Sequence, residues 1–266
     1  MKKMKKTRIR FFVNSAKRGA GALAEKLSRV AAGLGLETVP DAEADIVVAL
    51  GGDGTILRAV HEFPGVPVLG FNIGGLGFLS GVGAGEFESA LAKLAKGGYC
   101  VSARSMLSVA GRVALNEVVV MREMTGHAAL LEVAVGGKRP TVYMADGIVV
   151  ATPTGSTAYS LSAGGPVLMP DTGNIVITPM NPHALGVRPV VVCDSVKLVV
   201  SSVRRLGAGE EKVGVYLDGE AAMMLGAGES IEISKAPEPA LFVELDGYDP
   251  YEVLSRKLGW SGTNLK

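Results

Sequence analysis

The stretch IVVALGGDGT, residues 46–55, is the part of the chain around which the rest is organised. Its apolar, β-branched first half predicts a buried strand of the kind found in covered parallel sheets. The glycines that follow let the backbone turn sharply and approach a ligand closely. A helical pattern comes next, in residues 56–60, and the free N–H groups of a helix N-terminus suit phosphate. The stretch therefore predicts a strand–loop–helix unit that binds an anion.

Asp53 places a negative charge where such an anion would lie. One interpretation is a tight strand–helix turn in which Asp53 caps the helix. The other is a carboxylate with a chemical task, such as taking a proton from a substrate hydroxyl. The loop alone leaves both open.

Length and composition limit the possible fold classes and binding partners. The 266 residues, 48% of them hydrophobic, suffice for one large domain or two ordinary ones and argue against disorder. The 27 Lys and Arg residues balance 26 Asp and Glu residues, which favours neither nucleic acid nor an anionic membrane as a partner. The basic run of residues 1–10 precedes only three apolar residues, so it is not a signal peptide, and no run is long enough to span a bilayer. Cys100 and Cys193 lie far apart and are expected to be buried thiols in a reducing, cytoplasmic setting.

The first 98 residues alternate strand and helix patterns, which predicts a parallel sheet with helices on its faces. The predicted strands are residues 8–14, 45–50 and 67–72, and the predicted helices are residues 20–34, 55–62 and 86–96. Ligands of such folds bind outside the carboxyl ends of the strands. The glycine loops Gly51–Gly54 and Gly74–Gly77 both fall at such ends, so we expect them to line one crevice.

Short β-type runs dominate after Gly97-Gly98 and predict a second, all-β domain, either a sandwich or a closed sheet. The runs are residues 106–110, 113–120, 131–135, 142–143, 148–151, 175–178, 196–201, 213–217 and 231–234. A further apolar run, 241–245, and a helix, 250–257, are expected to pack back on the first domain. The predicted domains are thus 1–98 with 241–266, and 99–240.

Two segments of the second domain carry polar groups of interest. Thr152–Pro166 combines hydroxyls, small residues and glycines with one aromatic residue, Tyr159. Such a segment suits a flat polar ligand such as a nucleoside, although an ordinary Ser/Thr/Gly loop has the same composition. Asn116-Glu117 interrupts an apolar run and is either one face of an edge strand or a site. An amide beside a carboxylate can bond both an adenine edge and ribose hydroxyls.

Taken in order, these segments resemble the motifs of the NAD kinase family, over roughly Arg8 to Trp260. The segments that carry the resemblance are Gly51–Thr55, Gly70–Leu79, Asn116-Glu117, Asp146-Gly147, Thr152–Pro166, Pro179–Leu185 with Arg188-Pro189, Asp218-Gly219 and Leu258–Trp260. The first is shared with diacylglycerol, sphingosine and 6-phosphofructo-kinases, whereas Thr152–Pro166 is specific. The resemblance implies a Rossmann-like α/β domain, a C-terminal β-sandwich, and transfer of a nucleotide γ-phosphate to the 2′-hydroxyl of the adenosine ribose of NAD.

The resemblance also implies roles for the phosphate side of the site. Asp53 becomes the proton acceptor for the ribose 2′-hydroxyl, while backbone N–H groups cradle the donor phosphates. Those N–H groups belong to Gly51, Gly52, Gly54 and Thr55. Arg58, about one helical turn beyond the loop, either reaches a phosphate or is an exposed helix charge. ATP or polyphosphate is the expected donor, with Mg²⁺ or another divalent metal held mostly by phosphates and water, and no protein ligands are assigned to the metal.

On the acceptor side, the resemblance assigns most NAD contacts to the second domain. The expected contacts are Asn116, Glu117, Thr157, Ala158, Tyr159, Ser160, Leu161, Ser162 and Asn181, with Asp146 toward the nicotinamide and His127 as a further contact. His127 is otherwise a surface or packing residue. Family members are usually homodimers or homotetramers with NAD between the domains. Met144 replaces a basic residue of some members and leaves the choice of NAD or NADH open.

Two other functions compete with this interpretation. A lipid kinase of the diacylglycerol or sphingosine type is supported only by the Asp53 loop and is opposed by Thr152–Pro166. A non-catalytic NAD(P)-binding sensor would need no base at position 53.

Overall fold

The chain folds into two compact units, seen in a computed structural model that describes residues 6–14, 19–40, 43–75, 77–123, 127–204 and 212–260. The first unit comprises Met1–Ala103 and Ala240–Lys266, and the second comprises Arg104–Pro239. The expected α/β domain and β-rich domain are both present, and the last part of the chain returns to the first unit.

The first unit contains a six-stranded sheet over its described residues, and every strand pairing characterised in it is parallel. In spatial order its strands are β2 (Glu37–Thr38), β1 (Arg8–Val13), β3 (Ile46–Gly51), β4 (Val68–Asn72), β18 (Ala240–Leu245) and β5 (Tyr99–Arg104). Because β3 is buried at every position, its continuous apolar run reflects a sheet covered on both faces. The short strand β2 and the strand β5 were not predicted. Since β5 belongs to this sheet, the first domain extends to Ala103 rather than to residue 98.

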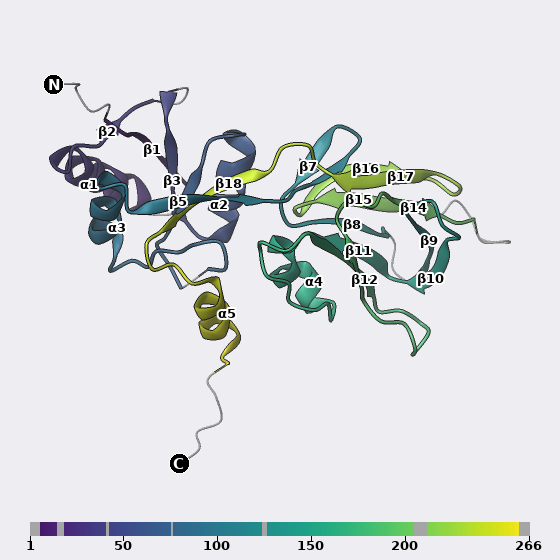
Figure 1. The fold of residues 1–266 in the computed structure, drawn as a ribbon. Coiled ribbons are helices and arrows are strands. Elements are labelled where there is room, and N and C mark those ends of the chain that lie inside the picture. Colours follow the sequence, from purple (N-terminus) through teal and green to yellow (C-terminus); the bar gives the residue numbers. More distant parts are fainter. Residues whose placement is uncertain are drawn as a thin grey trace, which may run out of the picture. The chain divides into compact units, whose positions relative to one another are not determined.

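Helices cover the two faces of this sheet, and they are drawn with it in Figure 1. The helices α1 (Ala20–Gly33) and α3 (Phe87–Ala95) contact one another and share a core with Val48 and Leu50 of β3. The helix α2 (Asp53–Glu62) packs against β3 and β4, where the Ile56 side chain fills the space above Gly70. The last helix, α5 (Pro250–Leu258), begins with a cap in which Asp249 accepts a hydrogen bond from the Tyr251 amide at 2.8 Å.

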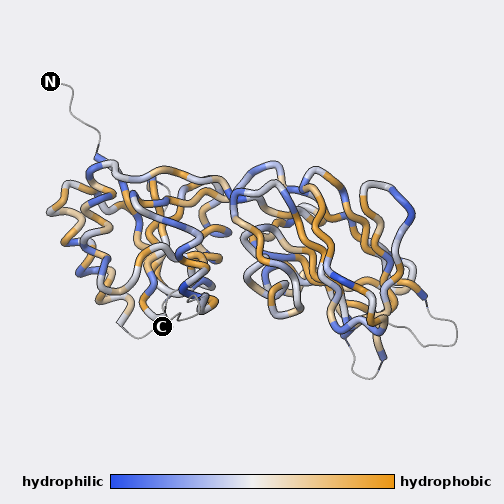
Figure 2. Tube along the Cα trace, turned by 60° about the horizontal axis from the view of Figure 1, so that its bottom comes forward, coloured by the Kyte–Doolittle hydropathy of each residue, from blue (hydrophilic) through white to orange (hydrophobic). Residues whose placement is uncertain are grey.

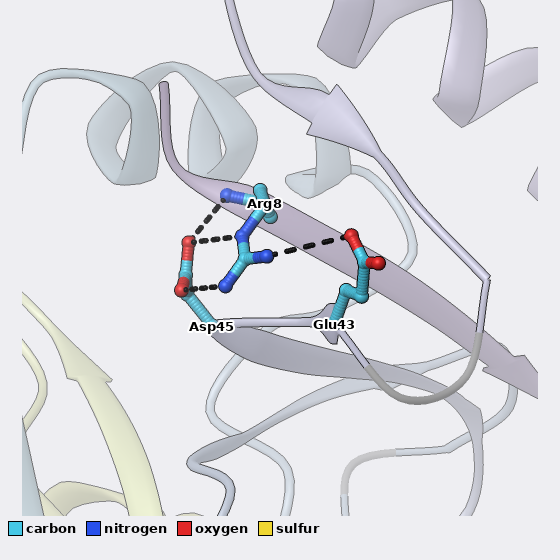
Figure 3. Close-up of polar contacts among 3 residues, drawn as sticks. All are labelled: Arg8, Glu43 and Asp45. Carbon is cyan, nitrogen blue, oxygen red and sulfur yellow. Dashed lines mark hydrogen bonds and ion pairs between the residues drawn. The ribbon is translucent and has the colours of Figure 1, made fainter. Parts of the chain in front are cut away.

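An arginine ties together the starts of the two strands β1 and β3 (Figure 3). The backbone amide of Arg8 donates to Asp45 Oδ2 at 2.9 Å, and its guanidinium donates to both oxygens of the same carboxylate, at 3.3 and 2.9 Å. Glu43 adds a longer ion pair at 3.6 Å. Because Arg8 faces two carboxylates on the segment that leads into β3, the register of β1 against β3 is anchored at this end.

The second unit is a sandwich of two six-stranded sheets over its described residues, and every strand pairing characterised in them is antiparallel. One sheet contains, in spatial order, β10 (Thr141–Ala145), β9 (Ala129–Val135), β14 (Leu198–Ser202), β17 (Ser230–Lys235), β6 (Leu107–Val109) and β7 (Arg112–Ala114). The other contains β13 (Val190–Cys193), β12 (Asn174–Met180), β11 (Gly147–Ala151), β8 (Glu117–Arg122), β15 (Val213–Leu217) and β16 (Glu220–Leu225). Apolar residues recur along these strands (Figure 2) and fill the space between the sheets.

Strand β8 shows how the sheet positions polar groups. Its residues Val118 and Val120 face the core between the sheets, whereas Val119 joins a smaller apolar cluster on the other face. Side chains alternate along a strand, so Glu117 also points to that second face. The same face is covered by the segment that holds the 3₁₀ helix η2 (Thr154–Thr157) and the helix α4 (Tyr159–Ser162).

Several sequence-based expectations need correction. The single strand predicted over residues 113–120 is two strands, β7 and β8, separated at Leu115-Asn116. Strands β13 and β16 were not predicted. The thiols of Cys100 and Cys193 are free as expected, but they are exposed rather than buried. Both lie on edge strands, β5 and β13, where an outward-facing side chain has no neighbouring layer to cover it.

None of the helices in the described ranges combines the length and the apolar character that a bilayer crossing requires.

Replacing Phe242 by Ala in β18 tests whether the returning strand supports the first unit. Phe242 is 4% exposed and is paired with Val68, so the cavity should lower the free energy of unfolding of this unit by about 3–5 kcal/mol. Urea denaturation measures the loss. The control Val101→Ala removes a 46% exposed side chain from the neighbouring strand β5 and should cost far less. Equal losses for the two variants would contradict this role of β18.

Candidate functional site

The first polar cluster lies where β3 ends and α2 begins. The helix is capped by Gly52 in an extended conformation, and Asp53 is its first residue. Gly51 has no room for a side chain, because the Thr55 side chain occupies that space. Thr55 is itself buried, and its amide donates to the Gly52 carbonyl oxygen at 2.8 Å. The first-turn amides that such a helix leaves without a partner inside it include those of Asp53 and the exposed Gly54.

The Asp53 carboxylate is held by the second glycine segment. Its Oδ2 accepts a hydrogen bond from the Phe78 amide at 2.8 Å, and its Oδ1 accepts one from the Leu79 amide at 3.2 Å. A Cβ atom on Gly77 would overlap this carboxylate. Asp53 therefore does not cap the helix, whose cap has no side-chain hydrogen bond. It joins the two glycine loops that the sequence placed at neighbouring strand ends.

Two buried polar residues shape the loop that holds Asp53. The Asn72 amide group donates to the Gly75 carbonyl at 2.7 Å and to Ser80 Oγ at 3.0 Å, and its oxygen accepts from the Gly74 amide at 2.8 Å. Ser80 Oγ also accepts from the Gly77 amide at 3.1 Å. Sequence reasoning missed these roles. The available signal was an asparagine at the end of an apolar strand, where a satisfied polar side chain is needed.

Arg58 and Lys257 are among the cations of the first unit that rest on aromatic rings. The Arg58 guanidinium lies 5.8 Å from the centre of the Phe12 ring, so in this conformation it is an exposed cation stacked on β1. The ammonium of Lys257, on α5, lies 5.3 Å from the centre of the Phe78 ring. Since the Phe78 amide bonds Asp53, the last helix adds positive charge beside the segment that holds this carboxylate.

The second polar cluster lies in the other unit, where β11 ends. The Thr152 amide donates to the Asn116 carbonyl at 2.9 Å, and its hydroxyl donates to the Leu115 carbonyl at 2.6 Å. A Cβ atom on Gly155 would overlap the Asn116 backbone. The Thr152–Pro166 segment is therefore bonded directly to Asn116-Glu117, and the structure brings these two predicted motifs together.

The predicted contacts in this segment differ in exposure. Tyr159 is 41% exposed and Ser162 is also exposed, while Thr157, Ala158 and Leu161 are half-buried. Ser160 is completely buried, and its hydroxyl lies 2.9 Å from that of Thr178, so it supports the segment rather than facing solvent.

Glu117 is a buried acid beside this segment. Its side chain is only 7% exposed, and its Oε2 has no hydrogen-bond partner among the described residues. Burial and, next, the negative charge of Asp218 raise the pKa of Glu117 to about 7, against a smaller lowering by a hydrogen bond from the Tyr159 backbone. Near neutral pH, Glu117 is thus close to half protonated.

The third polar cluster surrounds Asp146, at the other end of β11. Its Oδ2 accepts from the Asn181 amide group at 2.9 Å, and its Oδ1 pairs with Arg122 Nε at 2.7 Å. These two contacts, with the nearby His183, keep the pKa of Asp146 below its ordinary value. At about 3.3 Å per residue, Asp146 lies roughly 17 Å along the strand from Ala151. His127 is exposed and, by the register of β9 against β10, lies at this same end.

Carboxylates, histidines and cysteines do not gather in groups of three able to hold a metal within the described ranges.

Family models and relatives give one consistent picture. The ATP-NAD kinase N-terminal domain matches residues 9–99, and the ATP-NAD kinase C-terminal domain matches residues 115–245. The NAD kinase of Symbiobacterium thermophilum is 41% identical over 232 residues, covering 83% of this chain and 80% of its own length. The NAD kinase of Gemmatimonas aurantiaca is 38% identical, covering 84% and 80%.

Solved structures agree with this picture. An NAD kinase from Archaeoglobus fulgidus in complex with ATP superposes with a TM-score of 0.78 at 26% identity, over 95% of this chain and 97% of that one. Yeast NADH kinase complexed with NADH reaches a TM-score of 0.85 over 98% and 90% of the two chains, and at 24% identity it supports the fold alone.

Replacing Gly155 by Ala tests the contact between the two motifs of the second cluster. The added methyl group meets the backbone of Asn116, which cannot move aside cheaply because Thr152 holds its carbonyl. We expect the free energy of unfolding of the second unit to fall by about 1–3 kcal/mol. Urea denaturation measures it. Gly186→Ala is the control, since nothing lies within 4 Å of its Cβ position. A tolerated Gly155→Ala variant would refute the close approach.

Replacing Glu117 by Gln tests the buried acid through the pH dependence of stability. The raised pKa means that the folded state retains a proton that the unfolded chain loses above about 4.5. The resulting stabilisation is full below pH 4.5 and is lost as pH rises to about 7. Because Gln cannot ionise, the stability of the variant relative to wild type should increase by up to about 3 kcal/mol between pH 4.5 and 8.

Denaturation of both proteins over this pH range measures the difference. The exposed Glu220→Gln control should show no such trend. A pH-independent difference for Glu117→Gln would show that Glu117 ionises normally.

Proposed function

The chain belongs to the ATP-NAD kinase family, and we propose that it makes NADP by transferring the γ-phosphate of ATP to the 2′-hydroxyl of the adenosine ribose of NAD, with Asp53 as the base. The observation that carries the assignment to Asp53 is its position. The carboxylate opens α2, directly after the glycines, and two backbone amides fix its orientation. A carboxylate held in this way suits proton transfer better than simple capping.

The chemical step follows from these groups. A ribose hydroxyl is a weak nucleophile, and a positioned carboxylate that takes its proton is worth roughly 10²–10⁴-fold in rate. The 2′-oxygen forms a bond to the γ-phosphorus, the bond from this phosphorus to the bridging β-phosphate oxygen breaks, and ADP leaves. Each Asp53 oxygen accepts one amide hydrogen bond. Each therefore retains a lone pair for the incoming proton.

The donor phosphates are proposed to bind the first-turn amides of α2 and the glycines around them. Gly51, Gly52, Gly54 and Thr55 line this start of the helix. The Thr55 amide is already used by Gly52, so the cradle relies on the amides that precede it. Arg58 is proposed to reach a phosphate by leaving the Phe12 ring. Mg²⁺ is proposed to arrive with the donor and to neutralise the charge that phosphates and Asp53 place together.

NAD is proposed to bind the two polar clusters of the second unit. Its adenosine part would meet Asn116, Glu117 and Tyr159, with Thr157, Ala158, Leu161 and Ser162 beside them. Its nicotinamide part would meet Asp146, with Asn181 and His127 at the same end of β11. The separation of the two clusters along one strand, roughly 17 Å at 3.3 Å per residue, suits an extended dinucleotide. The proposed role of Ser160 is to support this segment from inside.

The oligomeric state and the cellular location of the protein are further proposals. A homodimer or homotetramer is supported by Val190 and Val191, apolar residues exposed at 45% and 43% on the edge strand β13. Unpaired edge strands with apolar side chains favour association. Two exposed free thiols fit a reducing, cytoplasmic environment. Polyphosphate stays a proposed alternative donor.

The two competing functions have less support than NAD kinase activity. A lipid kinase is not favoured, because both domain families and the curated relatives are NAD kinases. A binding protein without catalysis would gain nothing from a carboxylate fixed beside a phosphate-binding helix end.

Replacing Asp53 by Asn tests the proposed base. Asn keeps the shape of the side chain but cannot take the proton, so NADP formation from ATP, Mg²⁺ and NAD should fall at least about 10²-fold. NAD binding, measured by calorimetry without the donor, should survive. The control Glu62→Gln changes an exposed carboxylate at the far end of the same helix and should leave activity unchanged.

Turnover of Asp53→Asn near the wild-type rate would remove Asp53 as the base. Absence of NADP from wild-type protein with both ATP and polyphosphate would overturn the proposed function itself.

A further inference from the structure

Asp218 holds the backbone of the Asn116-Glu117 motif from a distant turn. It lies between β15 and β16 in the left-handed region, with φ 50°, and Gly219 follows with φ 84°. Its carboxylate accepts hydrogen bonds from three consecutive amides, those of Leu115 at 2.8 Å, Asn116 at 2.7 Å and Glu117 at 3.1 Å. Its own amide donates to the Glu117 carbonyl at 3.0 Å. This clamp accounts for the break between β7 and β8.

The backbone of the motif is fixed from its other side as well. The Thr152 amide and hydroxyl donate to the carbonyls of Asn116 and Leu115. With these backbone groups satisfied, the two side chains of the motif are the parts left for a ligand. The Glu117 side chain is more than nine-tenths buried, and its Oε2 has no partner among the described residues. A buried polar atom in this state is costly until a ligand satisfies it.

The charge that acts on Glu117 is negative. From the β15–β16 turn it faces the negative Asp218, and from α4 it receives only a hydrogen bond from the Tyr159 backbone. No cation of the described residues acts on it. The neutral form of this carboxyl group is therefore far more populated near neutral pH than in an exposed glutamate, and it offers one O–H donor together with acceptor capacity.

We propose that Asp218 is a positioning residue that fixes Asn116-Glu117 and keeps Glu117 as a neutral acid, whose O–H is donated to an acceptor on the adenosine part of the nucleotide. This inference rests on the proposed function, because it takes that nucleotide as the ligand. Under this proposal, binding of the nucleotide requires a proton on the Glu117 carboxyl group. The nucleotide selects protein in which Glu117 is protonated, so affinity is constant at lower pH and falls as pH rises above 7.

Calorimetric titration of NAD without a donor, from pH 6 to 9, tests the coupling. Wild-type affinity should fall by up to tenfold per pH unit above 7, the limit for one proton. Glu117→Gln should bind within a few-fold of wild type at pH 6 and show no such fall. Asp218→Asn should bind more weakly at pH 6, since the clamp loses acceptor strength, and its fall should begin at lower pH, because the negative charge that raises the pKa of Glu117 is removed. Glu220→Gln, an exposed change at the start of β16, directly after the same turn, should follow wild type.

A second measurement does not depend on NAD. The carboxyl ¹³C resonance of Glu117 in the unliganded protein, assigned by its loss in Glu117→Gln, should titrate near neutral pH. It should titrate at lower pH in Asp218→Asn. If that variant does not fold, the wild-type titration and the Glu117→Gln calorimetry still decide.

Affinity that is flat or that rises between pH 7 and 9 would overturn the proposal, as would a Glu117 resonance already ionised at pH 6. If NAD fails to bind at all, the proposed function fails instead, while the resonance still reports the state of Glu117.

Discussion

Carboxylates that accept hydrogen bonds from backbone amides far away in the sequence fix the shape of two of the three polar clusters, those of Asp53 and of Asn116-Glu117. Asp53 binds amides 25 and 26 residues later, and Asp218 binds amides more than 100 residues earlier. Charged acceptors make stronger hydrogen bonds than neutral ones, and each group here satisfies amides that neither helix nor sheet satisfies. Loops rich in glycine have little side-chain packing to define them, so these bonds define their shape.

Close approach to a glycine backbone is the second requirement of these two clusters, by a side chain at one glycine and by main chain at the other. Gly77 leaves room for the Asp53 carboxylate, and Gly155 leaves room for the Asn116 main chain. Neither glycine has the positive φ that would explain it by conformation, so the reason lies in space alone. The arrangement of these two clusters thus depends on glycine positions without a side chain as much as on the polar side chains themselves. The Asp53 carboxylate and the buried acid Glu117 are held within these tight surroundings, where small displacements alter hydrogen-bond geometry.

The sequence predicted those features that local patterns specify. In the chain, α2 follows β3 almost at once. The strand, the loop and a candidate role for Asp53 could therefore be predicted from one short stretch of sequence. The partners of Asp53, Phe78 and Leu79, act through backbone amides, which no residue type reveals. The same holds for Asp218, whose clamp splits an apolar run that reads as one strand. Edge strands such as β5 and β13 carry weaker patterns, because only part of each is covered. That partial cover also explains why both cysteines are exposed.

The return of the chain to the first unit sets an order of assembly. Strand β18 lies between β4 and β5, and α5 brings Lys257 to Phe78. All of these C-terminal residues are synthesised after the whole of the second unit, which is continuous in the chain. Domains generally fold as units during synthesis. The sandwich can therefore form while the α/β sheet still has a gap where an inner strand belongs. The sheet of the first unit is therefore completed only after its C-terminal strand has been synthesised, and so is the contact of Lys257 with Phe78 beside Asp53.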